Sequence, residues 1–199
     1  MKDTFRTIQS MSEGLYKEKG SKFLAFAYPV DSLDEVKQIL EQKRKEFYDA
    51  RHVCYAYMLG AERTDFRAND DGEPSSTAGK PILGQINAAE LTNVLVIVVR
   101  YFGGILLGTG GLTVAYKAAA ADAISNAEIV CKTITKKLRI SFAYEQTNLA
   151  MRLIKELQLD IVERQFDAQL THLTLQPTQS RYQQALNTFQ KNGINTNAE

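Results

Sequence analysis

The sequence contains few cysteines and no long apolar run. Its two cysteines, Cys54 and Cys131, lie far apart without a Cys-x-x-Cys spacing, and only two histidines accompany them. A disulfide framework and a structural zinc site are therefore excluded. No segment approaches the roughly 18 apolar residues of a membrane span, and the first residues lack the apolar region of a signal peptide. We expect a cytoplasmic protein with no membrane-spanning segment, no metal and no cofactor.

The chain also lacks a strong net charge. Its 24 lysines and arginines nearly balance 23 aspartates and glutamates, which leaves a net charge of +1. Residues 1–133 carry 16 basic and 17 acidic side chains (net −1), and residues 134–199 carry 8 and 6 (net +2). No global field attracts nucleic acid or anionic membrane, so any such binding must use a local patch. The hydrophobic fraction of 44% is ordinary for a globular protein.

The first part of the chain alternates strands and helices. Residues 21–30 are rich in aromatic side chains and end near Pro29, and Asp31 or Ser32 is placed to cap the helix that follows. The run 94–99 is short, apolar and β-branched, which indicates a strand buried on both faces. The expected elements are strands at 21–30, 52–59 and 94–99, helices at 33–47, 81–91 and 112–126, and a polar loop at 60–80.

The pattern changes after Val130. Residues 134–144 alternate as a strand, 146–158 form an amphipathic helix, 160–176 are typical of a hairpin, and 179–191 form a last helix. This β-α-β-β-α order predicts a small sheet with both helices on one face, a ferredoxin-like arrangement. We expect an α+β protein with one domain at residues 1–133 and a second at 134–199.

A glycine-rich segment follows the buried strand. Arg100-Tyr101-Phe102-Gly103-Gly104 ends that strand, and Gly108-Thr109-Gly110-Gly111 leads into a helix, so five glycines fall within nine residues. A helix N-terminus of this kind suits an anion. The spacing nevertheless lacks the lysine of a phosphate-binding loop and fails the dinucleotide fingerprint. An anion site and a tight strand-to-helix turn both remain open.

Three acidic residues lie close together in the second half of the polar loop. Asp70, Asp71 and Glu73 have the oxygen ligands that Mg²⁺ prefers, or the carboxylates of an acid/base pair. Their spacing is not that of an EF-hand. The alternative is a structural loop whose carboxylates pair with Arg51 or Arg100, because an arginine that ends so apolar a strand needs a partner when it is buried. We favour the arginine pairing.

His52 and Cys54 lie two residues apart on an expected strand and therefore point to the same face. One interpretation is a Cys–His nucleophilic pair. The other, which we favour, is a half-buried cysteine beside a structural histidine, because no third orienting group is evident.

Three separated motifs, taken in order, closely resemble the IMPACT family, also called the YigZ family. They are Ala50-Arg51-His52-Val53-Cys54-Tyr55-Ala56-Tyr57, the run Asp70-Asp71-Gly72-Glu73-Pro74-Ser75-Ser76-Thr77-Ala78-Gly79, and Val98-Val99-Arg100-Tyr101-Phe102-Gly103-Gly104-Ile105-Leu106-Leu107-Gly108 with Gly110-Gly111-Leu112. The resemblance covers most of residues 15–130. One departure is Ser76, where the family usually shows glycine.

The resemblance implies a first domain with the fold of ribosomal protein S5 domain 2. The second half is similar to the small ferredoxin-like domain of bacterial members, which is similar to the last domain of elongation factor G. Eukaryotic relatives regulate translation by binding a ribosome-associated activator of a stress kinase, and they lack this second domain. RNA or ribosome binding is an inference from fold.

Three hypotheses of function follow, in order of preference. The first is a translation-linked, non-enzymatic protein that binds RNA or a ribosome-associated partner. The second is an enzyme with Mg²⁺ at Asp70, Asp71 or Glu73 and the phosphate of a small substrate at Gly108–Gly111. The third is a protein–protein adaptor. The expected binding residues are Arg51, His52, Asp70, Asp71, Glu73, Thr77, Lys80, Arg100, Tyr101, Gly103, Gly104, Gly108, Gly110 and Gly111.

Overall fold

The computed structural model of the protein describes residues 3–198. The chain forms two compact units. One comprises Phe5–Lys132, and the other runs from Thr133 onward and includes the start of the chain up to Thr4. We refer to them as the N-terminal unit and the C-terminal unit.

The N-terminal unit is built on a five-stranded sheet in which every neighbouring pair is antiparallel. The strand order is β2-β3-β6-β4-β5. The strands are β2 (Ser12–Glu18), β3 (Ser21–Pro29), β4 (His52–Leu59), β5 (Asp65–Asn69) and β6 (Val94–Tyr101). Two further strands, β1 (Thr4–Ile8) and β7 (Ile129–Thr133), pair as a separate sheet.

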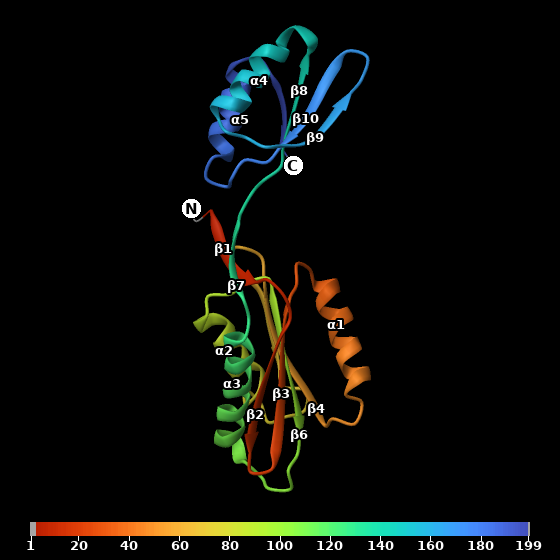
Figure 1. Cartoon of the computed structure of the whole chain (residues 1–199), viewed down its shortest axis with the longest axis vertical. Coiled ribbons are helices and arrows are strands. Elements are labelled where there is room, and N and C mark those ends of the chain that lie inside the picture. Colours follow the sequence, from red (N-terminus) through yellow and green to blue (C-terminus); the bar gives the residue numbers. More distant parts are fainter. Residues whose placement is uncertain (1–2, 199) are drawn as a thin grey trace. The chain divides into compact units, whose positions relative to one another are not determined.

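Helices cover both faces of the five-stranded sheet. Figure 1 shows α1 (Leu33–Glu46) on one side and α2 (Gly79–Ala88) with α3 (Gly108–Ser125) on the other. The central strand β6 is buried on both faces, as its apolar run predicts. Ser32 caps α1, because its side chain accepts a hydrogen bond from the backbone N–H of Glu35, which confirms one of the two expected caps.

Alternation along β6 sends neighbouring side chains to different layers. Val94, Val96 and Val98 join the core beneath α2 and α3, whereas Leu95 and Ile97 join the core beneath α1. Residues of even number at the end of this strand therefore face α2 and α3. This alternation decides which functional side chains meet.

The C-terminal unit is a four-stranded antiparallel sheet with helices on one face. Along the chain its elements are β8 (Leu138–Ala143), a short 3₁₀ turn η1 (Tyr144–Gln146), α4 (Thr147–Glu156), β9 (Ile161–Phe166), β10 (Leu170–Leu175), α5 (Tyr182–Lys191) and β11 (Asn195–Ala198). The sheet order is β11-β8-β10-β9. Leu138, Ile140 and Phe142 of β8 pack with Leu153 and Phe189 of the helices, so the opposite face of the sheet carries the polar side chains.

Several strands were not predicted from the sequence. Strands β1, β2, β7 and β11 were missed, and β5 lies within the segment expected to be a polar loop. Strands β2, β5 and β11 lie at the edges of their sheets, where one face and one side meet solvent, so they carry no apolar run. Helix α3 begins at Gly108, four residues before the expected start, because glycines are weak helix formers and hide the first turn.

Candidate functional site

Three segments of the N-terminal unit meet at one end of its sheet. His52 at the start of β4 pairs with Arg100 near the end of β6, and Phe23 of β3 pairs with Arg100 from the other side. Paired residues of neighbouring strands share a face, so all three side chains point toward α2 and α3. The acidic loop between β5 and α2 closes over them through Asp71 and Glu73.

A buried ion pair forms the centre of this cluster. Arg100 donates from Nη1 to Oε1 of Glu73 at 2.6 Å, and the hydroxyl of Tyr116 on α3 donates to the same oxygen at 2.8 Å. The side chains of Arg100 and Glu73 are only 8% and 3% exposed. A charge removed from water in this way requires a partner. The expected pairing of an acidic-loop carboxylate with Arg100 is confirmed.

The guanidinium of Arg100 lies against aromatic rings and keeps one donor without a partner. Its Cζ lies 5.6 Å from the ring centre of Phe23 and 5.7 Å from that of Phe102. Within the described chain, the buried Nε atom has no hydrogen-bond partner. Leaving such a donor unsatisfied costs about 1–3 kcal/mol. The fold therefore fixes the position of the Arg100 side chain but leaves one of its hydrogen-bond donors, Nε, without a partner in the described chain.

His52 is oriented by the loop backbone. Its Nδ1 lies 2.8 Å from the carbonyl oxygen of Asp71. A carbonyl oxygen only accepts, so Nδ1 must carry the proton. The other ring nitrogen, Nε2, lies 4.0 Å from Oε1 of Glu73 and forms no hydrogen bond within the described chain. The loop thus fixes the ring and leaves Nε2 for a ligand.

These side chains open onto a cavity of about 270 Å³. We call it the arginine pocket, and it is lined by Arg51, His52, Arg100, Phe102 and Leu106. Its floor is charged and buried, whereas Phe102 and Leu106 are 45% and 82% exposed and form an apolar wall. Cationic donors and an aromatic ring around one cavity suit an anion attached to a planar group.

The carboxylate of Asp70 serves the backbone of its own loop. It accepts hydrogen bonds from the N–H groups of Ser76, Ala78 and Gly79, at 2.8, 3.0 and 2.8 Å, and so caps α2 from outside the helix. Burial raises the pKa of Asp70, but these three hydrogen bonds outweigh burial and hold the pKa below its ordinary value. Asp70 is a structural anion.

The carboxylate of Asp71 is also occupied. It accepts from the backbone N–H of Val53 at 2.7 Å and pairs with Arg44 of α1 at 2.7 Å. The arginine partner of this residue is thus Arg44, whereas Arg51 forms no ion pair within the described chain. Among residues 3–198 no group of three or more metal-ligating side chains is assembled.

Cys54 is fully buried beside this network. Its Sγ lies 3.0 Å from the carbonyl oxygen of Asp70 and 3.3 Å from the hydroxyl of Tyr116. Burial raises the pKa of the Cys54 thiol far above its ordinary value, and burial does the same to Tyr116. The thiol therefore stays protonated at neutral pH. Since His52 bonds to Asp71 instead of Cys54, the structure supports the structural interpretation of this pair.

Other expected residues lie outside the pocket. Tyr101 packs on the α1 side of the sheet, and its hydroxyl donates to Asp49 at 2.8 Å. Thr77 is buried within its loop and donates to the carbonyl oxygen of Pro74. Lys80 is exposed on α2.

The glycines shape the backbone and do not line the pocket. A Cβ at Gly103 would collide with the backbone of Gly20 and Ser21, so this position requires glycine for close approach. Gly104 and Gly108 have φ of +88° and +70° and permit the turn into α3. Gly110 and Gly111 lie in the first turn of that helix. The tight-turn interpretation therefore accounts for Gly103, Gly104 and Gly108.

The expected binding residues did not include Phe102, Leu106 or Tyr116, although the position of Tyr101-Phe102 beside glycines and an arginine allows exposed rings for stacking. Phe102 follows the last residue of β6, where alternation no longer applies, so its direction depends on the loop path. Tyr116 lies 43 residues after Glu73, beyond α2 and β6, and becomes its partner only through the packing of α3. The period of α3 places Tyr116 on the buried face, which is the one signal that was available.

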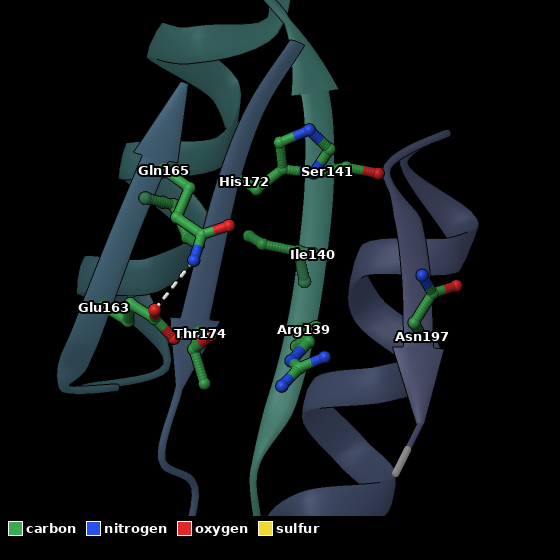
Figure 2. A pocket seen from close by; sticks show the side chains of 9 residues that line it. Arg139, Ile140, Ser141, Glu163, Gln165, His172, Thr174 and Asn197 are labelled. Atoms are coloured by element: carbon green, nitrogen blue, oxygen red, sulfur yellow. Dashed lines mark hydrogen bonds between the residues drawn. The ribbon is translucent and has the colours of Figure 1, made fainter. Parts of the chain in front are cut away.

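A second cavity of about 270 Å³ lies on the open face of the C-terminal sheet. Figure 2 shows its side chains rising from all four strands on the face away from the helices. The polar lining residues are Arg139, Ser141, Glu163, Gln165, His172, Thr174 and Asn197. We call this surface the polar sheet face. Gln165 donates to Glu163 at 2.8 Å, as drawn in Figure 2, and His172 Nε2 lies 2.8 Å from Asp167.

Comparison with known proteins identifies the family. The model of the Impact N-terminal domain matches residues 19–124, which contain the arginine pocket and the acidic loop. The chain belongs to the IMPACT family. The similarity to bacterial family members extends beyond that domain: an IMPACT family member of Haemophilus influenzae is 33% identical over 159 residues, covering 79% of this chain and 77% of the relative.

Other relatives give the same result. The IMPACT family member YigZ of Escherichia coli is 34% identical over 152 residues, covering 75% of this chain and 74% of YigZ. A crystal structure described as that of a hypothetical protein matches with a TM-score of 0.74 at 27% identity, covering 100% of this chain and 98% of the other. In the part of the chain that the structure describes, no helix is both long and apolar enough to cross a membrane.

Proposed function

We propose that this IMPACT family protein is a translation-linked binding protein of the cytoplasm that holds RNA, free or within the ribosome, and catalyses no reaction. For the first domain, residues 1–133, we propose a fold like that of ribosomal protein S5 domain 2. The β-α-β-β-α-β order of the C-terminal unit and its sheet order β11-β8-β10-β9 support a ferredoxin-like fold over residues 134–199. Fold alone does not assign a function, so the proposal rests on the sites.

The observation that carries the proposal is the arginine pocket. Arg51 and Arg100 supply guanidinium groups for a phosphate, and Phe102 supplies an exposed aromatic face for a base. Proteins bind single-stranded RNA by this combination of cationic contacts and stacking. The net charge near zero is compatible with it, because a local patch suffices.

The polar sheet face supports the same proposal in a secondary role. Its amide, hydroxyl and imidazole groups both donate and accept hydrogen bonds, as the 2′-hydroxyl groups of RNA do, and its guanidinium group donates them. Apart from the imidazole of His172, the lining residues of its cavity include no aromatic ring, so this surface offers less for stacking than the arginine pocket does. We propose that it adds contacts to the sugar and phosphate.

The Mg²⁺-dependent enzyme is less well supported. Asp70, Asp71 and Glu73 all have partners within the chain, and using any of them for a metal would break a helix cap or an ion pair. The protein–protein adaptor, the third hypothesis from the sequence, becomes the second candidate, because the exposed Ile105 and Leu106 form an apolar tip beside the pocket. Sensitivity of binding to nuclease separates RNA from a protein partner.

The test measures binding of a fluorescent single-stranded RNA of about ten nucleotides by anisotropy, at KCl concentrations from about 25 to about 200 mM. Each phosphate contact should add about 0.7 to the steepness with which the logarithm of the binding constant falls with the logarithm of the salt concentration. Arg51→Ala should weaken binding and lower that slope by about 0.7. Arg152→Ala on α4 removes an equal charge from an exposed helix and serves as the matched control. If neither the RNA nor ribosomes bind at low salt, or if both variants behave alike, the proposal is wrong.

A further inference from the structure

We propose that the arginine pocket binds a terminal phosphomonoester of an RNA strand, with the terminal base against Phe102. This inference rests on the proposed function and specifies which part of the RNA enters the pocket. It starts from the number of donors that face one small cavity. Arg51, His52 and Arg100 all line it. The nearby carboxylates already have partners: Arg100 and Tyr116 bind Glu73, and Arg44 and the backbone N–H of Val53 bind Asp71.

The donors match the charge of a phosphomonoester. Such a group carries about −1.5 to −2 charges at pH 7 and three terminal oxygens, whereas an internal phosphodiester carries a single charge. Two guanidinium groups supply the donors. Nε2 of His52, whose ring carries its proton on Nδ1, accepts a hydrogen bond from a protonated phosphate oxygen, or donates one when the ring is an imidazolium. Arg100 is 6% exposed and lines the cavity, and its buried Nε has no partner in the described chain, so the fold leaves part of the hydrogen-bonding capacity of this guanidinium unused.

The pocket has a closed floor. Beneath Arg100 lie Glu73 and Tyr116, which are 8% and 0% exposed, so no strand of RNA can continue through the floor. A terminal phosphate can present three unesterified oxygens to such a floor, whereas a phosphodiester within a strand presents only two and must keep both ester oxygens toward the open side. The burial of the charged floor therefore favours a strand end over the middle of a strand.

The wall is fixed by backbone packing. Gly103 lies so close to the Gly20–Ser21 backbone that no side chain fits, and its N–H donates to the Ser21 hydroxyl at 3.1 Å. This contact anchors the segment that carries Phe102 and Leu106. A volume of about 270 Å³ lies just below the roughly 300–1,000 Å³ of typical small-molecule sites. It suits one nucleotide unit.

The experiment uses three unlabelled RNA octamers of one sequence as competitors for the labelled RNA, at one salt concentration and with the full-length protein. One carries a 5′-phosphate, one a 3′-phosphate and one has hydroxyl groups at both ends. We expect one phosphorylated octamer to bind about tenfold more tightly than the other two, since a charge-assisted contact differs between them. The two phosphorylated octamers have equal charge, so their comparison removes non-specific attraction and shows which end is bound.

Variants identify the pocket as the source of the preference. Arg51→Gln, at an exposed position, should reduce the tenfold preference to twofold or less, and Phe102→Leu should weaken the preferred octamer most. Arg152→Gln should leave the preference intact. Substitutions of Arg100 are avoided because its ion pair supports the fold.

The outcomes separate the two proposals. Equal binding of all three octamers, or an equal gain from both phosphorylated ones that survives Arg51→Gln, overturns the terminal-phosphate inference and leaves RNA binding in place. Competition by uridine monophosphate as strong as that of the preferred octamer overturns the strand-end assignment in favour of a free nucleotide. Absence of any RNA binding overturns the proposed function itself.

Discussion

The two units place their charged groups in opposite ways. In the N-terminal unit, Arg100 and Glu73 pair with side chains 8% and 3% exposed. In the C-terminal unit, His172 and Asp167 pair with side chains 41% and 54% exposed. Water screens the second pair and not the first, so the same type of contact has different energetic weight in the two units.

This difference separates a preformed site from an adaptable one. Arg100 is positioned by Glu73 and two aromatic rings, and His52 is oriented by Asp71, before any ligand arrives. Such preorganisation lowers the entropic cost of binding. The polar sheet face instead presents solvated side chains whose hydrogen bonds are local and exposed. We expect substitutions to be costly in the first region and mild in the second.

The largest expected effect comes from breaking the buried pair. Glu73→Gln leaves the Arg100 charge buried without a carboxylate, which should lower the free energy of unfolding by about 3–5 kcal/mol. The matched control is Glu163→Gln on the polar sheet face, with an expected change within about 1 kcal/mol. Urea denaturation, followed by circular dichroism, measures the change in the free energy of unfolding of each variant. Hydrogen-exchange mass spectrometry shows which of the two units has lost stability.

A double variant sharpens this test. Glu73→Leu with Arg100→Met removes both charges and fills the space with apolar side chains, so it should recover much of the stability lost by Glu73→Gln. If Glu73→Gln costs no more than Glu163→Gln, the buried pair does not hold the site together, and the contrast between the units disappears.

The second effect concerns the cap of α2. Asp70→Asn removes a carboxylate that accepts three backbone hydrogen bonds, and we expect a loss of about 1.5–3 kcal/mol at pH 7. The pKa of Asp70 is lowered in the folded state, so its stabilisation is present above the ordinary aspartate pKa of about 3.9 and disappears as the pH falls through the lower folded value. The difference in stability between the two proteins should therefore shrink below about pH 3.9.

Denaturation curves of both proteins between pH 2.5 and 7 measure that difference. Asp65→Asn, on the exposed strand β5, is the control for adding an amide in the same region. A stability gap that stays constant over the whole range would mean that Asp70 acts through its shape and not through its charge.

Sequence patterns predicted the buried elements better than the site. The apolar run 94–99 and the paired pattern at 160–176 identified β6 and the β9–β10 hairpin, because burial on one or both faces dictates residue type. The buried arginine demanded an anion, which led correctly to the acidic loop. Which carboxylate of that loop pairs with Arg100 could not be predicted, because the backbone path of the loop determines which of them lies next to the guanidinium.

Other parts of the site depended on contacts that leave no local signal. The pairing of Asp71 with Arg44 joins a loop to a helix 27 residues earlier. Tyr101 was expected beside Arg100, although strand alternation sends it to the other face. Ser76 adopts φ of +66°, so the loop requires at this residue a left-handed conformation that glycine adopts more readily than serine.

The smallest expected effect is at the exposed pair of the C-terminal unit. Hydrogen bonds lower the pKa of Asp167 to about 2. The bond with His172 has the largest effect, followed by those from the backbone N–H groups of Gln169 and Leu170. His172→Gln should raise that pKa only part of the way to its ordinary value, because the two backbone donors remain. NMR titration of the Asp167 carboxyl carbon in both proteins measures the shift.

The stabilisation by Asp167 depends on pH in the same direction as that by Asp70, but we expect it to be smaller. The pKa of Asp167 is lowered, so its contribution to stability is present above about pH 3.9 and disappears as the pH falls through about 2. Both side chains are well exposed, so His172→Gln should leave the midpoint of urea denaturation at pH 7 almost unchanged. A large loss there, comparable to that of Glu73→Gln, would show that the hairpin pair supports the fold and that exposure does not distinguish the two units.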